Sequence, residues 1–427
     1  MLNTLPRKTT LALATFAMIS AFLPHGIRLP LLVSTFSLPL PCPRLPQTTT
    51  IGAKPAPLSQ SPLEIPAGSL DTFYASLRRI EAKQPGAITR VLHYGDSPTT
   101  ADSITSDIRR LLQARFGDAG HGYLLIAKPW AWYGHNGIKL DGRGWTIEPA
   151  NQGWARDGIH GLGGVSFKGE PGAASRVILP DDQYTRVIIY YLAQPGGGNF
   201  TISTREAKIE QVHTAADEMK PSFAELNLPP GTRAIQLAVT SGSVRLFGYR
   251  FDKDHTGVQY SSLGVNGAQV QMIVRHFDAG QWTLQLRHEN PDLVVISYGT
   301  NESLYPAYVE KEYPRELRRV IATLREALPH ASILLMGPMD RGTGPDISTP
   351  PALHAIIEAQ RKAAAETGCA FFNTFAAMGG EGTMNRWYHS QPRLVSADFL
   401  HPMPAGAAIV GSLFEKALMA AYEASKQ

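Results

Sequence analysis

The chain has 427 residues, of which 43% are hydrophobic and 18% charged, as expected for a soluble protein with two folded domains and a tail. The formal net charge is only +4 and no basic run stands out, which excludes nucleic acid as an expected partner.

The N-terminus has the pattern of an export signal. Arg7 and Lys8 precede an apolar run over residues 11–23. We therefore predict a signal peptide or membrane anchor over residues 1–25, and a periplasmic or extracellular location, with anchoring to the inner membrane left open. A buried N-terminal helix is the alternative, but the Pro-rich stretch that follows disfavours it.

Residues 26–66 are rich in Pro and Thr and are predicted to be an extended linker. One of the two cysteines, Cys42, lies in this linker. The other, Cys369, opens an apolar run, so we expect a buried thiol and no disulfide.

Residues 67–135 are predicted to form the first part of an α/β domain. Phe73, Leu77 and Ile80 have helical spacing, and Ser69 or Asp71 is a candidate helix cap. A strand over 89–94 leads into Gly-Asp-Ser at 95–97, and a second helix follows.

Residues 136–253 change character. Glycines are dense and short apolar β-type runs occur at 176–179, 186–191, 234–239 and 244–249, separated by Pro-Gly turn signals. Short strands at this spacing predict an inserted all-β domain of the sandwich or jelly-roll kind.

Residues 254–427 return to α/β alternation. The predicted strands are 293–298, 332–336 and 370–372, and the predicted helices are 316–328, 352–367 and 404–424. Continuous apolar strands between helices predict a parallel sheet covered on both faces, hence an α/β fold interrupted by the β insert.

Ser97 is the candidate nucleophile. It follows a strand and precedes a helix, so it should lie at the carboxyl edge of a parallel sheet, where open α/β folds place their sites. Free N–H groups of the following helix favour developing negative charge there. On its own, Gly-Asp-Ser is more often a turn and helix cap.

Asp398 and His401 are the candidate partners of Ser97. At this spacing a carboxylate can hold one imidazole nitrogen while the other accepts the serine proton. A capping Asp and a surface His explain the pair equally well in isolation.

Two further residues are candidate oxyanion donors. Asn301 follows a strand that ends at the same edge, and Gly267 offers a backbone N–H where a side chain would block approach. The simpler readings are an Asx-turn residue and a loop glycine.

The order of these four blocks resembles that of the SGNH hydrolase family, also called GDSL. The resemblance covers about 70–135 and 255–427 and implies a three-layer α/β sandwich. It implies that Ser97 is the nucleophile, that Asp398 and His401 complete the triad, and that the N–H groups of Ser97 and Gly267 join Asn301 as oxyanion donors. No metal-binding or phosphate-binding motif is present, so neither metal nor cofactor is expected.

A narrower resemblance rests on residues 291–302 and 333–338 and on the inserted β module. These features are similar to periplasmic peptidoglycan O-acetylesterases, whose substrate is an acetyl ester on a glycan sugar. Acetylated glycan is therefore the expected partner and a monomer the expected state. The candidate substrate contacts are Trp130, Trp132, Arg341 and Tyr388. Core aromatic residues of the β domain are the commoner explanation of the two tryptophans, and a solvated loop charge is the simpler explanation of Arg341.

Two other functions fit the same sequence. A polysaccharide O-acetyltransferase would use the same triad and pass the acetyl group to a sugar hydroxyl. A glycan-binding wall protein with an inactive hydrolase domain is disfavoured by the intact triad residues. Peptidoglycan is the favoured polymer, and exopolysaccharide and plant hemicellulose also fit.

Overall fold

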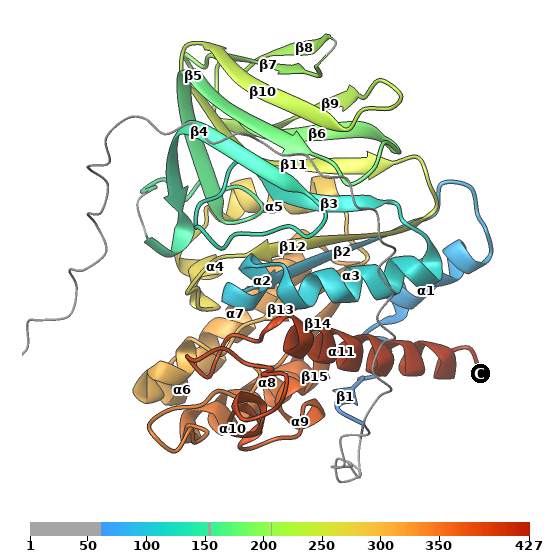
Figure 1. Ribbon diagram of the computed structural model, residues 1–427, viewed down its shortest axis with the longest axis vertical. Coiled ribbons are helices and arrows are strands. Elements are labelled where there is room, and N and C mark those ends of the chain that lie inside the picture. Colours follow the sequence, from blue (N-terminus) through green and yellow to red (C-terminus); the bar gives the residue numbers. More distant parts are fainter. Residues whose placement is uncertain (1–60, 153–154, 206) are drawn as a thin grey trace, which may run out of the picture. The chain divides into compact units, whose positions relative to one another are not determined.

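The computed structural model describes residues 61–152, 155–205 and 207–427 (Figure 1). The predicted export signal, most of the predicted linker and Cys42 lie outside the described residues. The described residues form two sheets, one parallel apart from an edge strand and one antiparallel.

The first sheet has six strands in the order β1-β15-β14-β13-β2-β12. All neighbours run parallel except β1, which pairs antiparallel with β15 at the edge. The predicted parallel sheet is thus confirmed. Its strands are β1 (Leu63–Glu64), β2 (Ile88–Gly95), β12 (Gly257–Gly264), β13 (Leu293–Ser297), β14 (Ser332–Met336) and β15 (Ala370–Phe372).

Helices cover both faces of this sheet. Successive strand residues point to opposite faces, so Val294 joins a core with α5, α7 and α8 while Val295 joins one with α1, α3 and α11. Burial on both faces explains why the strands are continuously apolar. The helices are α1 (Asp71–Glu81), α2 (Ser97–Thr100), α3 (Ser103–Phe116), α4 (Gln271–His276), α5 (Ala279–Glu289), α6 (Pro306–Lys311), α7 (Tyr313–Ala327), α8 (Pro351–Thr367), α9 (Thr374–Ala377), α10 (Thr383–Tyr388) and α11 (Pro404–Ala424), with a short 3-10 turn η2 (Glu302–Leu304).

The second sheet is the predicted β insert, and its all-β character is confirmed. Nine antiparallel strands form one branched, nearly barrel-shaped sheet, in which β3 pairs with β11 and β4 with β5 (Figure 1). Its elements are β3 (Gly120–Leu125), β4 (Lys139–Pro149), the 3-10 turn η1 (Ala150–Gln152), β5 (Val165–Ile178), β6 (Tyr184–Ala193), β7 (Asn199–Ser203), β8 (Lys208–His213), β9 (Lys220–Asn227), β10 (Ala234–Ser241) and β11 (Val244–Lys253).

Some local details differ from the sequence interpretation. The residue before α1 is Leu70, with no side-chain capping bond, so neither Ser69 nor Asp71 caps the helix as predicted. Strand β3 belongs to the antiparallel sheet although it precedes residue 136. Strand β1 lies within the segment predicted as linker, because its backbone completes the edge at β15.

Two other features concern burial. Cys369 is a buried free thiol, as predicted. Within residues 61–427, apart from 153–154 and 206, none of the helices has both the length and the apolar character needed to cross a membrane.

Candidate active site

Three neighbouring strands bring the candidate residues together. Strands β12, β2 and β13 lie side by side and parallel. Because their carboxyl ends meet at one edge, Gly267, Ser97 and Asn301 lie in the loops that follow them there. This placement agrees with the sequence interpretation.

Ser97 is the first residue of α2 and follows the tight turn at the end of β2. A Cβ on Gly95 would come within 2.2 Å of Thr99 Oγ1, so only glycine allows the first turn of α2 to approach the strand. The Thr100 N–H then donates to Asp96 O at 2.9 Å, which closes that turn. The Ser97 hydroxyl is held at the helix start, with only 8% of the residue exposed.

Asp398 and His401 come from a loop just ahead of α11. His401 Nε2 lies 2.7 Å from Ser97 Oγ, and His401 Nδ1 lies 2.6 Å from Asp398 Oδ2. The three side chains therefore form a continuous hydrogen-bonded chain across residues more than 300 positions apart. With Asp398 accepting from Nδ1–H, His401 Nε2 is free to accept the serine proton.

The loop that carries the pair is itself fixed. Ser396 N–H donates to His401 O at 2.8 Å, and Gly342 N–H donates to Phe399 O at 2.8 Å. Phe399 has a φ of +57°, an unfavourable value for a bulky residue. Its ring meets the Tyr388 ring edge-on, with centroids 4.7 Å apart, which holds the loop in this conformation.

Asp398 remains ionised in this setting. Burial raises its pKa, but hydrogen bonds from the Ser396 hydroxyl, the His401 ring and the His401 and Leu400 N–H groups outweigh it and lower the pKa to about 2. A charged Asp398 stabilises the imidazolium that forms when His401 takes a proton.

The candidate oxyanion donors lie on facing loops. Asn301 Nδ2 donates to Ala268 O at 2.9 Å and lies 3.5 Å from Asp96 Oδ2, so the amide is fixed between the Gly267 loop and the nucleophile turn. Burial raises the Asp96 pKa to about 7, which reduces the negative charge beside a developing oxyanion.

The backbone conformation gives a further reason for glycine at position 267. A Cβ there would meet no protein atom closer than Asn151 Nδ2 at 3.9 Å, so crowding within the protein does not require glycine. Its φ of +70° does, because side chains rarely adopt that conformation.

The candidate substrate contacts have different surroundings. Trp130 is partly buried and packs against the core, whereas Trp132 is 54% exposed. The Tyr388 ring packs against Phe399 in the loop that carries Asp398 and His401. Arg341 Nη1 donates to Thr300 O and Ser303 Oγ, both at 3.1 Å, and so supports the Asn301 loop.

Glu302 was missed by the sequence interpretation. Its side chain is fully buried, and its two oxygens accept Val270 N–H at 2.7 Å and Gly299 N–H at 3.0 Å. It thus ties the loop after β12 to the loop after β13, which carry both candidate oxyanion donors. An acid directly after Gly-Thr-Asn was the only sequence signal.

Replacing Glu302 with Gln should therefore damage both stability and catalysis. Gln offers a single acceptor oxygen, and its NH₂ would face a buried N–H donor. We expect the free energy of unfolding to fall by about 1–3 kcal/mol and kcat to fall with it. Denaturant unfolding and aryl acetate hydrolysis measure the two effects. Exposed Glu310→Gln on α6 is the matched control, and equal behaviour of the two variants would contradict the positioning role.

One buried cluster has the donor types of a metal site. The possible ligand atoms of Asp102, His121 and His135 lie within 4.8 Å of one another. However, Arg109 donates to both Asp102 oxygens, at 2.6 and 3.2 Å, and Asn136 N–H donates to one of them at 2.8 Å. The carboxylate is already engaged by a cation, so we assign this cluster a structural role.

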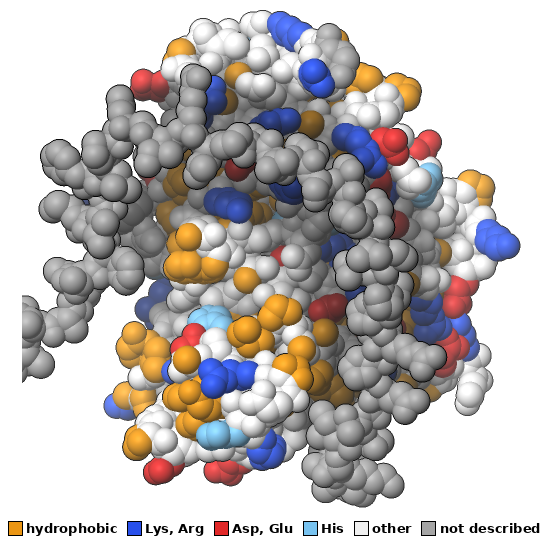
Figure 2. Space-filling model, in the orientation of Figure 1, with side chains coloured by type: hydrophobic (Ala, Val, Ile, Leu, Met, Phe, Trp, Pro, Cys, Tyr) orange, Lys and Arg blue, Asp and Glu red, His pale blue; other side chains and the backbone are white. Residues whose placement is uncertain are grey.

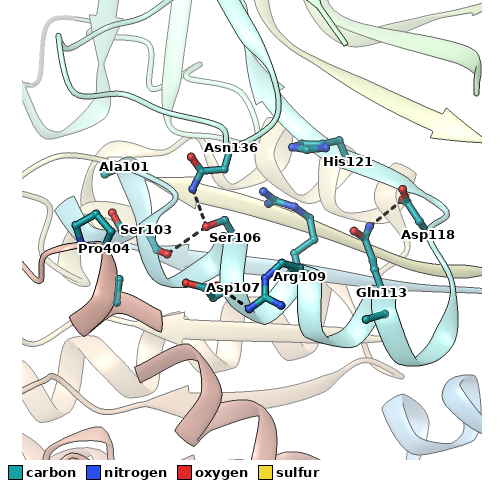
Figure 3. A pocket seen from close by; sticks show the side chains of 13 residues that line it. Ala101, Ser103, Ser106, Asp107, Arg109, Gln113, Asp118, His121, Asn136 and Pro404 are labelled. Carbon is teal, nitrogen blue, oxygen red and sulfur yellow. Dashed lines mark hydrogen bonds and ion pairs between the residues drawn. The ribbon is translucent and has the colours of Figure 1, made fainter. Parts of the chain in front are cut away.

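A large hollow among the described residues lies along α3 rather than at Ser97. It has a volume of about 770 Å³, and Figure 3 shows Arg109, Asn136 and His121 on its walls. Among the described residues that line it, none is Ser97, Asp398 or His401. We therefore place the chemistry by the hydrogen-bonded triad and not by cavity size.

Comparison with known proteins gives a family match for part of the chain and similar solved structures. Residues 236–409 match the GDSL-like Lipase/Acylhydrolase family. No curated protein matches the chain. A solved peptidoglycan O-acetylesterase is similar with a TM-score of 0.73 and 21% identity, covering 85% of this chain and 99% of that one. An acetylxylan esterase from Geobacillus stearothermophilus has 23% identity and a TM-score of 0.29, covering 38% of this chain and 73% of that one.

The family match covers the loops that carry Gly267, Asn301, Asp398 and His401, and the first of the two solved structures shares the fold. The matched segment contains the second, third and fourth of the four sequence blocks, and Ser97 of the first block lies before it. Residues 236–409 thus form a GDSL-like lipase/acylhydrolase segment, set within a chain whose fold is similar to that of a solved peptidoglycan O-acetylesterase.

Proposed function

We propose that the protein is an exported serine esterase that removes O-acetyl groups from a polysaccharide, with peptidoglycan as the favoured substrate. The observation that carries the proposal is the chain of hydrogen bonds from Asp398 through His401 to Ser97, at 2.6 and 2.7 Å. Such a chain activates a serine hydroxyl for attack on an ester carbonyl.

The reaction proceeds in two steps. His401 accepts the Ser97 proton as Ser97 Oγ attacks the acetyl carbonyl, and the oxyanion forms near the N–H groups of Ser97 and Gly267 and the Asn301 amide. The C–O bond to the sugar then breaks, and His401 protonates the departing sugar oxygen. Water, deprotonated by His401, next attacks the acetyl carbon of the acetyl-serine. The bond from that carbon to Ser97 Oγ breaks, acetate leaves, and His401 returns its proton to Ser97 Oγ.

Three observations favour an acetylated glycan in the cell wall. The similar structure that covers 85% of this chain is named a peptidoglycan O-acetylesterase, and the acetylxylan esterase acts by its name on another acetylated glycan. The N-terminal charged and apolar segments favour export. Trp132 is exposed and its indole N–H donates to Asn266, the residue before Gly267, so its ring is available to stack on a sugar ring.

Acetate release from defined polymers tests the proposal. The full-length protein is incubated with O-acetylated peptidoglycan, acetylated exopolysaccharide and acetylated xylan, with Ser97→Ala as the blank. Serine-dependent acetate release, fastest from peptidoglycan, is the expected result. Release from another polymer alone would overturn the peptidoglycan assignment. Acetyl-sugar formation without free acetate would instead show a transferase, and release from none would overturn the proposal.

A further inference from the structure

An exposed tryptophan lies beside the nucleophile turn. Residues 130–134 connect β3 to β4, and Gly134 N–H donates to Thr100 O at 3.2 Å. A Cβ on Gly134 would lie 2.9 Å from Ala101 O, so this segment contacts the end of α2, the helix that begins at Ser97. Tyr133 is buried, and its hydroxyl accepts Leu125 N–H at 2.9 Å. The segment is thereby fixed and leaves Trp132 at the surface.

The indole of Trp132 is also fixed in orientation. Its Nε1–H donates to Asn266 Oδ1 at 3.1 Å, and Asn266 directly precedes Gly267. The polar edge of the ring is satisfied by the protein, while 54% of the residue remains exposed. A large ring held in place with solvent-exposed surface is suited to stacking against the apolar face of a sugar.

A cleft adjoins the same loop. It has a volume of about 460 Å³, within the roughly 300–1,000 Å³ of small-molecule sites, and Gly267 lies on its wall. Asn151 lines it and donates through Nδ2 to Asn266 O at 2.6 Å. Asn266 therefore contacts both Trp132 and Asn151, a residue of the cleft wall.

The lining of this cleft is polar and close to neutral. Its polar side chains are amides, tyrosines, one His and one Arg, and the described lining residues include no acid. The cation, Arg275, is paired with Glu316 at 3.3 Å. Amides and hydroxyls suit the hydroxyl and acetamido groups of neutral sugars. Tyr305, 55% exposed, adds a second aromatic ring to the cleft.

The surface around these elements is rich in apolar side chains. Figure 2 shows hydrophobic side chains gathered on the left of this face, level with α2 and α4 and further down near α6 and α10 in Figure 1. Exposed large hydrophobic residues include Trp132 in the connection between β3 and β4, Leu304 in η2, Tyr305 directly before α6 and Met403 directly before α11. Exposed apolar groups at a cleft mark a binding surface.

We propose that Trp132 and the cleft beside Gly267 bind the sugar units next to the acetylated one, so that the enzyme selects oligomeric, neutral or acetamido glycans over isolated acetyl sugars. This inference rests on the proposed esterase function. Trp132, Asn151 and Tyr305 are specificity-determining residues in it, and they come from three different segments of the chain.

A comparison of three substrates tests this inference: O-acetylated chitohexaose, the O-acetylated N-acetylglucosamine monomer and p-nitrophenyl acetate. The wild type should show a higher kcat/KM for the hexamer than for the monomer. In Trp132→Ala, the ratio of kcat/KM for the hexamer to that for p-nitrophenyl acetate should fall about ten-fold, mainly through KM. Tyr305→Ala, on a different element, should lower the same ratio several-fold.

Two further variants separate stacking from loop positioning. Trp132→Phe keeps a ring and removes the bond to Asn266, so it should retain most of the hexamer preference. Leu284→Ala, at another exposed apolar residue on α5, is the matched control and should behave like the wild type. An equal loss on all three substrates in Trp132→Phe would show that Trp132 only positions the oxyanion loop, which overturns the inference.

The failure of this inference is distinguishable from the failure of the proposed function. A wild type that hydrolyses p-nitrophenyl acetate but no glycan overturns the glycan esterase itself. A wild type that deacetylates hexamer and monomer equally, or Trp132→Ala and Tyr305→Ala variants with an unchanged hexamer ratio, overturns only the binding surface.

Discussion

Ser97→Ala is expected to lower kcat for ester hydrolysis by about 10⁴-fold or more, because no other group replaces the attacking oxygen. The hydroxyl lies 2.7 Å from His401 Nε2 at the start of α2, and removing one oxygen leaves the surrounding packing intact. Release of p-nitrophenol from p-nitrophenyl acetate, followed to long times, measures the residual rate.

The matched control is Ser103→Ala, another serine a few residues along the same segment, at the start of α3. It should retain wild-type activity, and thermal unfolding should show both variants to be folded. A folded Ser97→Ala variant with more than about a tenth of wild-type activity would exclude Ser97 as the nucleophile and with it the acetyl-enzyme pathway.

Asp398→Asn is expected to lower kcat by about 10²–10⁴-fold. The Asp398 carboxylate accepts His401 Nδ1–H at 2.6 Å, and an Asn amide can turn its NH₂ toward that nitrogen instead. The ring would then carry its proton on Nε2, where it can no longer accept from Ser97. Asp346→Asn, at an exposed acid in the loop before α8, is the matched control and should be silent.

The pH dependence follows from the same residue. The folded pKa of Asp398 is about 2, below its ordinary 3.8, so the carboxylate is charged at any pH above about 4. Its contribution to stability is present above that pH and is lost as the pH falls through about 2. The kcat/KM profile of the wild type should show no step from Asp398 above about pH 4. A step in the kcat/KM profile above about pH 4 that is present in the wild type and absent in Asp398→Asn would contradict this assignment.

Much of the fold could be predicted from the sequence because the faces of an element that are buried determine which of its residues are apolar. Strands β13 and β14 are continuously apolar since helices cover both of their faces. The turn signals and short apolar runs within residues 136–253 indicated an inserted β domain, because strands of this length need frequent turns between them. The local pattern does not show which sheet a fully buried strand joins, which is why β3 was grouped with the catalytic part.

The candidate site was predictable where residue type and spacing carry the chemistry. Ser97 follows a strand and precedes a helix, and Asp398 lies three residues before His401. Each position has a local signature, and the resemblance of their order to that of the SGNH family implied that they meet. The contact between Ser97 and His401 is long-range, and the 2.7 Å hydrogen bond between their side chains shows it.

The sequence by itself determined the α/β frame, the inserted β domain and the residues that could act on an ester. Only the tertiary structure decided how the neighbouring loops are joined: Glu302 bridges the loops after β12 and β13, and Trp132 and Asn151 both bind Asn266. These contacts join residues that are as much as 134 positions apart. The hydrophobic periodicity of a single segment does not indicate which distant group a side chain will contact.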